Sequence, residues 1–212
     1  KELGAVGQRF IDRTQPSLEA QLTNLADEIA YNSHDIDDGL RSGLITIEQL
    51  EEVEFFARLW HEVQAAYPGL SGRRAIYETL RRLITALADD LIVTSTALLR
   101  DANPGSVDEV RASAPLIRFS DGMRKDATEL KRFLRQNLYR HYMVNRMRVK
   151  ASRIVRELYE AFMAEPVLLP PDYQNNSGDV GKQARMIADY IAGMTDRYAI
   201  REHRRIFSLE EL

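Results

Sequence analysis

The stretch LADEIAYNSHDIDDG, residues 25–39, decides how the rest of the chain is interpreted. Its apolar residues recur three and four positions apart, which is typical of an amphipathic helix. At about 100° per residue, such a helix gathers its polar side chains on one side. They are Asp27, Tyr31, His34, Asp35 and Asp38. The opposite side carries Leu18, Leu22, Leu25, Ile29 and Ile36. We therefore expect this helix to pack into a core while presenting carboxylates, a phenol and an imidazole together.

The polar face of this helix has two interpretations. A solvated face is the common one, because most surface helices have one. The composition favours the other, since three acids accompany a tyrosine and a histidine, and no lysine is among them. Such a set suits the binding of a cation or of a sugar hydroxyl.

Helical spacing of apolar residues continues along the chain, and convincing strand-like alternation is absent, which predicts an all-α fold. Proline and glycine cluster at a few joints. Helices are predicted over residues 16–40, 46–67, 72–100, 106–113, 122–166 and 182–200. The 122–166 segment is either one long bent helix or two helices that meet near residues 137–145. Its predicted apolar stripe contains Val144, Met147, Ala151, Ile154 and Leu158. Residues 166–181 are predicted to form a loop.

Composition excludes several classes of protein. The 212 residues include 44% apolar residues and carry a formal net charge of -3, so bulk charge favours neither a nucleic-acid coat nor a membrane surface. The absence of cysteine excludes disulfides and thiolate metal sites. No signal peptide, membrane-spanning stretch or phosphate-binding glycine loop is expected. Asn175-Asn176-Ser177 fits a glycosylation sequon, but nothing else suggests secretion, and we expect a cytoplasmic protein.

Several segments carry a resemblance to a known family. They are SLEAQ at 17–21, ADEIAY at 26–31, HDIDDGL at 34–40, KASRIVR at 150–156 and YIAGMTDRYA at 190–199. In this order, they resemble the dGTPase-like deoxynucleotide triphosphohydrolases of the HD superfamily, over nearly the whole chain. The resemblance implies an all-α, HD-domain-like helical bundle. It also implies hydrolysis of a deoxynucleoside triphosphate (dNTP) to the deoxynucleoside and inorganic triphosphate.

The same resemblance implies roles for three residues. In this family, a divalent metal is held by a histidine, a His-Asp pair and a later aspartate. Asp27 stands where the later aspartate falls. Tyr31 and Asp35 match positions that contact the deoxyribose, where Asp35 would accept a hydrogen bond from the 3′-hydroxyl.

The chain departs from the family pattern in its histidines. No histidine precedes Asp27, and the dipeptide His34-Asp35 follows the aspartate that the metal-binding pair should precede. Since a mixed site needs three or four protein ligands, Asp27 alone is not expected to hold a metal. We expect a chain that lacks the N-terminal HD helices, contains no identifiable catalytic residue and is inactive by itself. The metal expected for the intact site is Mg or Mn, and Ni, Co or Fe also suit its ligands.

This interpretation divides the chain into two parts. Residues 1–45 are predicted to be the last part of an HD-type catalytic core. Residues 46–212 are predicted to complete the substrate pocket and the oligomer interface.

Other residues have both a binding and a structural interpretation. Arg146, Lys150 and Arg153 share one helical face, which either clamps a triphosphate or is solvated. Arg140 and His141 lie just before them.

Further along, Tyr139 either stacks on a base or packs, and Arg197 either reaches a nucleotide or pairs with an acid such as Glu202. Trp60 is expected in a core or an interface, and Asp89-Asp90 on the surface.

The partners follow from the resemblance. A dNTP substrate is expected, with dGTP favoured, in a homo-oligomer that is a hexamer in many relatives. A regulatory nucleotide or a single-stranded nucleic acid is a further expected partner. The alternative is a non-catalytic helical module that binds nucleotides or a partner protein.

Overall fold

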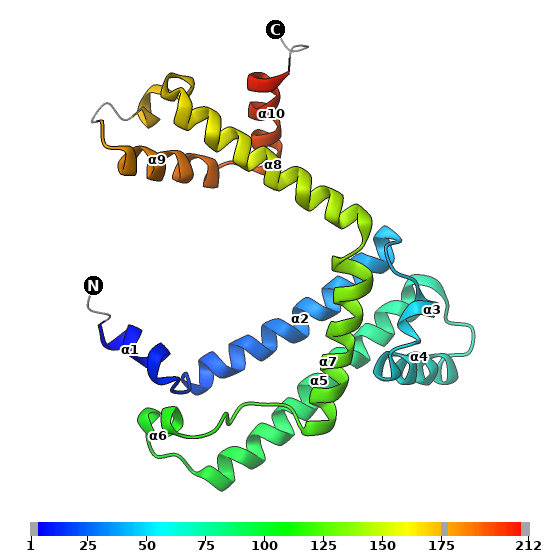
Figure 1. The fold of residues 1–212 in the computed structure, drawn as a ribbon. Helices are drawn as coiled ribbons and strands as arrows, with labels where there is room; N and C mark the ends of the chain where they lie inside the picture. Colours follow the sequence, from blue (N-terminus) through cyan, green and yellow to red (C-terminus); the bar gives the residue numbers. More distant parts are fainter. Residues whose placement is uncertain (1–3, 175–177, 209–212) are drawn as a thin grey trace. The chain divides into compact units, whose positions relative to one another are not determined.

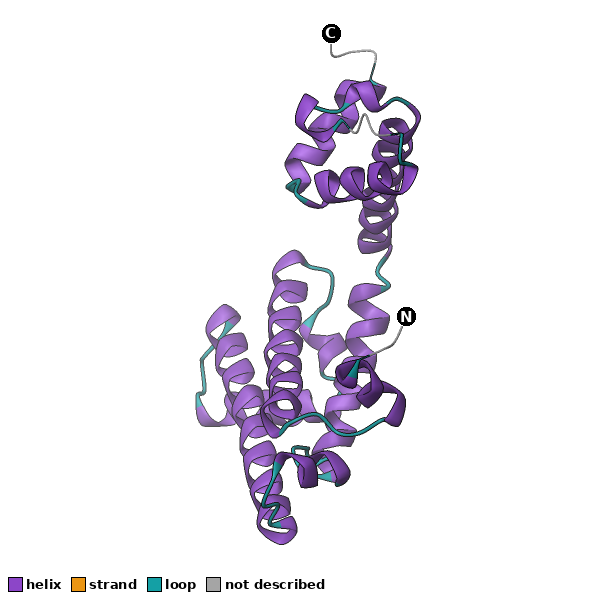
Figure 2. Ribbon diagram, turned by 90° about the vertical axis from the view of Figure 1, so that its left-hand side faces the viewer, coloured by secondary structure: helices purple, strands orange, loops and turns teal. Residues whose placement is uncertain are grey.

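The computed structural model describes residues 4–174 and 178–208, and every regular element in these ranges is a helix (Figures 1 and 2). The all-α prediction is therefore confirmed. The first three residues and the Asn175–Ser177 sequon lie outside the described ranges. The elements are α1 Ala5–Asp12, α2 Leu18–Ser42, α3 Ile47–Leu50, α4 Glu54–Ala66, α5 Gly72–Ala102, α6 Val107–Ala112, α7 Asp121–Leu134, η1 Arg135–Tyr139, α8 Tyr142–Ala164, η2 Pro166–Leu168, η3 Pro171–Tyr173, α9 Val180–Ala192 and α10 Asp196–Phe207.

The chain divides into two compact units, Lys1–His141 and Tyr142–Leu212. The boundary confirms that two helices meet near residues 137–145, since η1 ends at Tyr139 and α8 begins at Tyr142. The predicted division at residue 45 concerns the extent of a catalytic core, and it stays a prediction.

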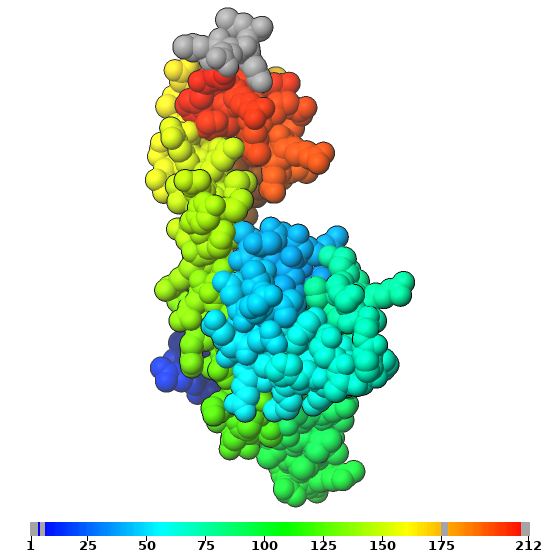
Figure 3. Space-filling model, turned by 90° about the vertical axis from the view of Figure 1, so that its right-hand side faces the viewer, coloured from blue at the N-terminus to red at the C-terminus, as the bar shows by residue number. Residues whose placement is uncertain are grey.

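The core of unit 1 lies among α2, α4, α5 and α7. Figure 3 shows the side of this unit where the cyan atoms of α3 and α4 form a continuous surface. Trp60 is partly buried against this core and stacks on Phe56 at 6.4 Å between ring centroids. The largest fully buried side chains of the unit are Phe55, Phe56, Ile36, Ile45, Leu50, Leu83, Leu87, Leu130 and Leu134.

The helix predicted over residues 46–67 is two helices. The Thr46–Gln49 capping box is present, but it begins only the four residues of α3. Val53 then adopts an extended backbone conformation, with φ -91° and ψ 110°, and is 3% exposed. The extended backbone at Val53 therefore interrupts the helix, and α4 begins at Glu54.

The helix predicted over residues 182–200 is also two helices. Gly193 ends α9, and the Thr195 side chain accepts a hydrogen bond from the backbone N–H of Tyr198 to cap α10. A threonine that caps a helix breaks the one before it, because the capping residue itself is extended. The second helix, α10, runs on to Phe207.

Two predictions of burial in unit 1 are wrong. Leu22 is 48% exposed, and the buried residue of this turn is Gln21. The Gln21 Oε1 atom accepts hydrogen bonds from the backbone N–H groups of Leu116 and Ile117, at 3.0 and 3.1 Å. Asp90 is half-buried rather than on the surface, and it accepts hydrogen bonds from the backbone and side chain of Ser120. Both contacts fix the segment that leads into α7.

The close packing of Ile45 against α2 depends on Gly39. A Cβ atom at this position would lie 2.8 Å from two side-chain carbons of Ile45 and 3.4 Å from Leu138 Cδ1. Helix α2 runs through Gly39 and ends at Gly43, whose φ of 70° suits glycine. The missing side chain therefore leaves room for Ile45, which packs back against the last turns of α2.

Unit 2 consists of α8, α9 and α10 with the short helices η2 and η3. Its buried residues are Ile154, Leu158, Phe162, Leu169 and Ile187. The apolar stripe predicted on α8 is buried only from Ile154 onward, because Met147 is 62% exposed and Ala151 is also exposed. The His203 ring of α10 lies 2.6 Å from a carboxylate oxygen of Glu157 on α8.

Within residues 4–174 and 178–208, no helix combines the length and the apolar character needed to cross a membrane.

Candidate functional site

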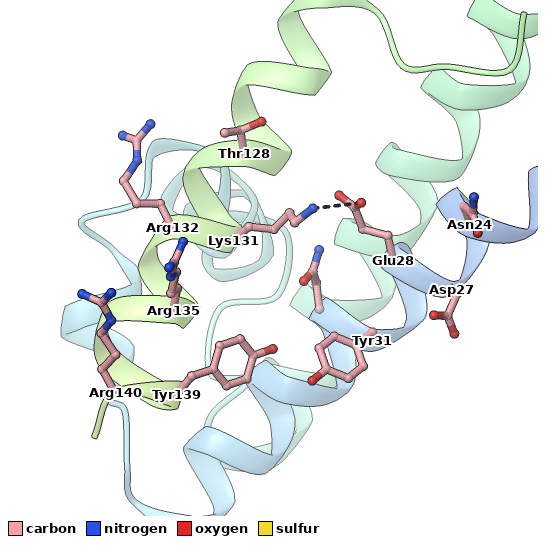
Figure 4. A pocket seen from close by; sticks show the side chains of 11 residues that line it. Asn24, Asp27, Glu28, Tyr31, Thr128, Lys131, Arg132, Arg135, Tyr139 and Arg140 are labelled. Atoms are coloured by element: carbon pink, nitrogen blue, oxygen red, sulfur yellow. Dashed lines mark ion pairs between the residues drawn. The ribbon is translucent and has the colours of Figure 1, made fainter. Parts of the chain in front are cut away.

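Unit 1 contains an open cleft of about 800 Å³ between α2 and the α7–η1 segment (Figure 4). Its lining residues are mostly polar. They are Asn24, Asp27, Glu28, Tyr31, Asn32, Thr128, Lys131, Arg132, Arg135, Tyr139 and Arg140. The cleft therefore lies entirely within one unit, and two helical walls form it.

The wall on α2 presents carboxylates, amides and a phenol at helical spacing. Asp27 and Tyr31 are one turn apart, and both are exposed to the cleft. Asn32 is only 5% exposed but still lines the cleft. The buried residues Ile29 and Ile36 hold the other face of the helix in the core. The amphipathic pattern thus fixes which polar side chains reach the cleft.

The wall on α7 and η1 is cationic. Thr128, Lys131, Arg132 and Arg135 recur at three- and four-residue spacing, and Leu130, Phe133 and Leu134 anchor the opposite face. Four cations and two carboxylates line the cleft as a whole, so it favours an anion. In the described part of the chain, neither Arg132 nor Arg135 has an acidic partner.

The last turn of this wall is a π-helix, Arg135–Tyr139. Such turns are rare and occur often at functional sites. This one carries Arg135 and Tyr139 into the cleft while Leu138 packs, 7% exposed, beside Gly39.

Polar contacts join the walls. The Lys131 Nζ atom lies 3.0 Å from Glu28 Oε2, and the Tyr139 hydroxyl donates a hydrogen bond to Asp35 Oδ2. The rings of Tyr31 and Tyr139 project toward each other, with centroids 6.4 Å apart and planes inclined at 39° (Figure 4).

The Tyr139 hydroxyl is held in its protonated form. Burial raises the pKa of this group above its ordinary value of 10.0, and the hydrogen bonds with Asp35 and Tyr31 raise it further. Tyr139 therefore acts as a hydrogen-bond donor at every pH near neutrality, and it fixes one oxygen of the Asp35 carboxylate.

The structure brings together five of the residues singled out from the sequence. Asp27, Tyr31, Tyr139 and Arg140 line the cleft, and Asp35 joins them through Tyr139. His34 is exposed and does not line the cleft.

The other candidates lie elsewhere. His141 ends unit 1, and its backbone N–H donates to the Leu138 carbonyl at 3.0 Å. Arg146, Lys150 and Arg197 belong to unit 2. Glu202, the acid suggested for Arg197, instead pairs with Arg205 at 2.5 Å.

The cations of α7 and η1 were not predicted from the sequence. Lys131, Arg132 and Arg135 carry the same spacing signal as Arg146 and Lys150, but they were not considered. A search for cations at three- and four-residue spacing on the face opposite Leu130 and Leu134 would have found them.

The described residues do not supply a full set of ligands for the metal that the resemblance implies. Among residues 4–174 and 178–208, no group of three or more His, Asp or Glu side chains is arranged to hold a metal ion. Asp27 contributes one carboxylate to the cleft, which is fewer than the three or four protein ligands of a mixed site.

Comparisons with known proteins define the class of the chain. Residues 117–205 match a family model described as a phosphohydrolase-associated domain. This match includes α7 and η1, so the cationic wall of the cleft lies within it. The described ranges are thus all-α and include a phosphohydrolase-associated domain.

Curated relatives define the family more closely. The chain is 63% identical over 209 residues to a deoxyguanosinetriphosphate triphosphohydrolase-like protein of Bordetella pertussis, covering 99% of this chain and 54% of the relative. Proteins of the same name from Ralstonia nicotianae and Thiobacillus denitrificans are 60% and 55% identical over 210 and 212 residues. These matches cover 99% and 100% of this chain, and 54% and 56% of the two relatives. The chain belongs to this deoxyguanosinetriphosphate triphosphohydrolase-like family, and it spans about half the length of these relatives.

Proposed function

We propose that this chain supplies part of the nucleotide site of a metal-dependent dNTP triphosphohydrolase. The observation that carries the proposal is the cleft of unit 1, where a cationic wall faces carboxylates and tyrosines. A nucleoside triphosphate has the same division, with an anionic chain at one end and an uncharged sugar and base at the other.

In this proposal, each wall binds a different part of the substrate. Lys131, Arg132 and Arg135 contact the triphosphate, because arginine forks match phosphate oxygens and lysine adds a mobile point charge. Tyr31 and Asp35 contact the deoxyribose, and Asp35 accepts a hydrogen bond from the 3′-hydroxyl. Tyr139 already occupies Asp35 Oδ2, so Oδ1 is the oxygen left for that hydroxyl.

Asp27 is the proposed metal ligand within this chain. It projects from α2 beside Glu28 and Tyr31 (Figure 4). The remaining ligands belong, in this proposal, to the part of the longer relatives that this chain does not span. The overall reaction is hydrolysis of a dNTP by one water to the deoxynucleoside and inorganic triphosphate, and the chain by itself is inactive.

Further parts of the proposal rest on the family resemblance. The favoured substrate is dGTP, the metal is Mg or Mn, and the protein assembles as a homo-oligomer, with a hexamer as the expected form. A regulatory nucleotide or single-stranded nucleic acid is a proposed additional partner.

The test is an assay for triphosphate release from each dNTP with Mg or Mn. The chain is assayed alone and together with the portion of the Bordetella pertussis relative that it does not span. Activity only in the mixture supports the proposal. Activity of the chain alone would show that the metal site is misplaced and that His34 deserves reconsideration. Nucleotide binding without activity in either sample would favour a non-catalytic module.

A further inference from the structure

One ion pair spans the cleft of unit 1. Glu28 on α2 and Lys131 on α7 lie 3.0 Å apart, and Figure 4 shows the lysine extending from its own wall toward the other. Within the described residues, this is the ion pair that links α2 to α7. Glu28 is the more enclosed partner, because its side chain is 27% exposed and that of Lys131 is 50% exposed.

The cations of the cationic wall differ in how firmly they are held. Lys131 has Glu28, whereas Arg132 and Arg135 have no acidic partner in the described part of the chain. A lysine ammonium has three donors, so its contact with Glu28 leaves two for other acceptors. Among these three cations, Lys131 is therefore the one that an acidic partner holds before an anion arrives.

Core residues surround Glu28 on one side. It borders a small internal space together with Ile29, Asn32, Leu87, Phe119, Ala127 and Leu130. Four of these six are buried core residues from α2, α5 and α7, and Phe119 lies just before α7. Glu28 thus lies against the core, which limits the positions that its side chain can take.

We infer that Glu28 is a positioning residue, which holds the Lys131 ammonium over the cleft for a phosphate oxygen of the substrate. This inference rests on the proposed function, because it assumes that the phosphate chain lies along α7. It goes beyond that proposal by giving a role to an acid that would otherwise repel the substrate.

Glu28 has two opposing physical effects on the affinity of the cleft for an anion. Its negative charge disfavours an anion, but the lysine between them and the solvent screen that repulsion. Its hold on Lys131 removes rotamer freedom that an anion would otherwise have to restrict on binding, and lysine has a large amount of such freedom. Positioning is therefore expected to exceed repulsion, so that removing the acid weakens anion binding.

The test measures binding of inorganic triphosphate to the 212-residue chain by calorimetry. We expect Glu28→Gln to weaken the affinity about five-fold, near the upper end for an exposed ion pair. Simple charge removal predicts the opposite, tighter binding. Unchanged or tighter binding by Glu28→Gln would overturn the inference.

A matched control separates positioning from a merely structural link. Asp126 on α7 pairs with Arg58 on α4 at 3.6 Å, outside the cleft. Asp126→Asn should change the melting temperature about as much as Glu28→Gln while leaving triphosphate affinity unchanged. An equal loss of affinity in both variants would reduce Glu28 to a structural contact.

The exchanged pair gives a second, independent readout. Glu28→Lys combined with Lys131→Glu restores the ion pair but moves the cation onto α2. We expect its melting temperature to match that of the unmodified chain and its triphosphate affinity to stay low. Recovery of full affinity would contradict positioning on α7.

The experiment also separates this inference from the proposed function. If Arg135→Ala loses triphosphate affinity and Glu28→Gln keeps it, the cleft assignment stands and the positioning role fails. If the unmodified chain does not bind triphosphate, both fail together.

Discussion

The two units of the chain both carry a helix with a row of cations, but among the residues that the structure describes, the row in unit 1 alone faces a polar wall. In unit 1, Lys131 and Arg135 face Asp27 and Tyr31 across a cleft of about 800 Å³. Unit 2 has a hollow of about 760 Å³ beside α8. Its lining is largely apolar, and its charged members are Arg156 and Asp196. A row of cations therefore becomes a candidate site only when the fold supplies a second wall.

The largest effect is expected at Asp27. The assay combines the chain with the portion of the Bordetella pertussis relative that the chain does not span. In this mixture, Asp27→Ala should lower turnover at least about 100-fold, because a metal ligand is lost. Asp38→Ala is the control, since Asp38 is an exposed acid of the same helix outside the cleft. Steady-state triphosphate release is the measurement. Similar rates for the two variants would remove Asp27 from the metal site.

A core substitution in each unit should separate the two regions. Phe162→Ala removes a side chain that is 1% exposed in unit 2, and a loss of about 3–5 kcal/mol in the free energy of unfolding is expected. Triphosphate affinity should change less than about two-fold, because the cleft lies in the other unit. Phe56→Ala, at a fully buried position of unit 1, should cost a similar amount and also weaken binding.

Chemical denaturation and calorimetry on both variants check this prediction. A loss of triphosphate binding in Phe162→Ala as large as that in Phe56→Ala would show that the cleft depends on unit 2.

A smaller effect is expected at the sugar end of the cleft. In the reconstituted assay, Asp35→Asn should lower kcat/KM for dGTP about 10-fold, and Tyr139→Phe about three- to five-fold. The tyrosine effect is smaller because it removes only the donor that orients Asp35. Triphosphate affinity of the chain should stay unchanged in both. Wild-type kinetics in Asp35→Asn would exclude its role at the deoxyribose.

The smallest effect concerns acid stability in unit 2. The hydrogen bond with His203, and then that with Arg153, lowers the pKa of Glu157 below its ordinary value of 4.5. Since the folded pKa is the lower one, this contribution to stability is fully present above pH 4.5. It is lost as the pH falls through the folded pKa.

Thermal unfolding of Glu157→Gln across this acidic range checks the sign. The difference in melting temperature between this variant and the unmodified chain should shrink as the pH falls below 4.5. A difference that stays constant would show that Glu157 contributes through packing rather than through its charge.

Local sequence patterns predicted the helices well where those patterns are strong. The periodicity of residues 18–40 and the Thr46–Gln49 capping box appear in the structure as expected. The Val53 turn was missed because nothing local distinguishes it from another helical apolar residue. Burial of Asp90 was missed for a different reason, since its partner Ser120 lies 30 residues away.

The candidate site shows the same limit of local patterns. Asp27 and Tyr31 were found because they share one helix and a family resemblance. The contact between Asp35 and Tyr139 joins residues 104 positions apart, and no periodicity reveals it. In the sequence, Arg132 and Arg135 cannot be distinguished from ordinary solvent-exposed cations. Their position in the cleft follows only from the packing of α7 against α2. Pairing of helices through the core, rather than helix formation, therefore decides which polar residues meet.

The most direct test of the account compares the two rows of cations in one experiment. Calorimetry would measure inorganic triphosphate binding to Arg132→Ala/Arg135→Ala in unit 1 and to Arg146→Ala/Lys150→Ala in unit 2. We predict that the first variant loses at least about 10-fold in affinity, because two charge-assisted contacts are removed. We predict a change of less than about two-fold for the second. A large loss in the unit 2 variant with full binding in the unit 1 variant would contradict the assignment of the cleft.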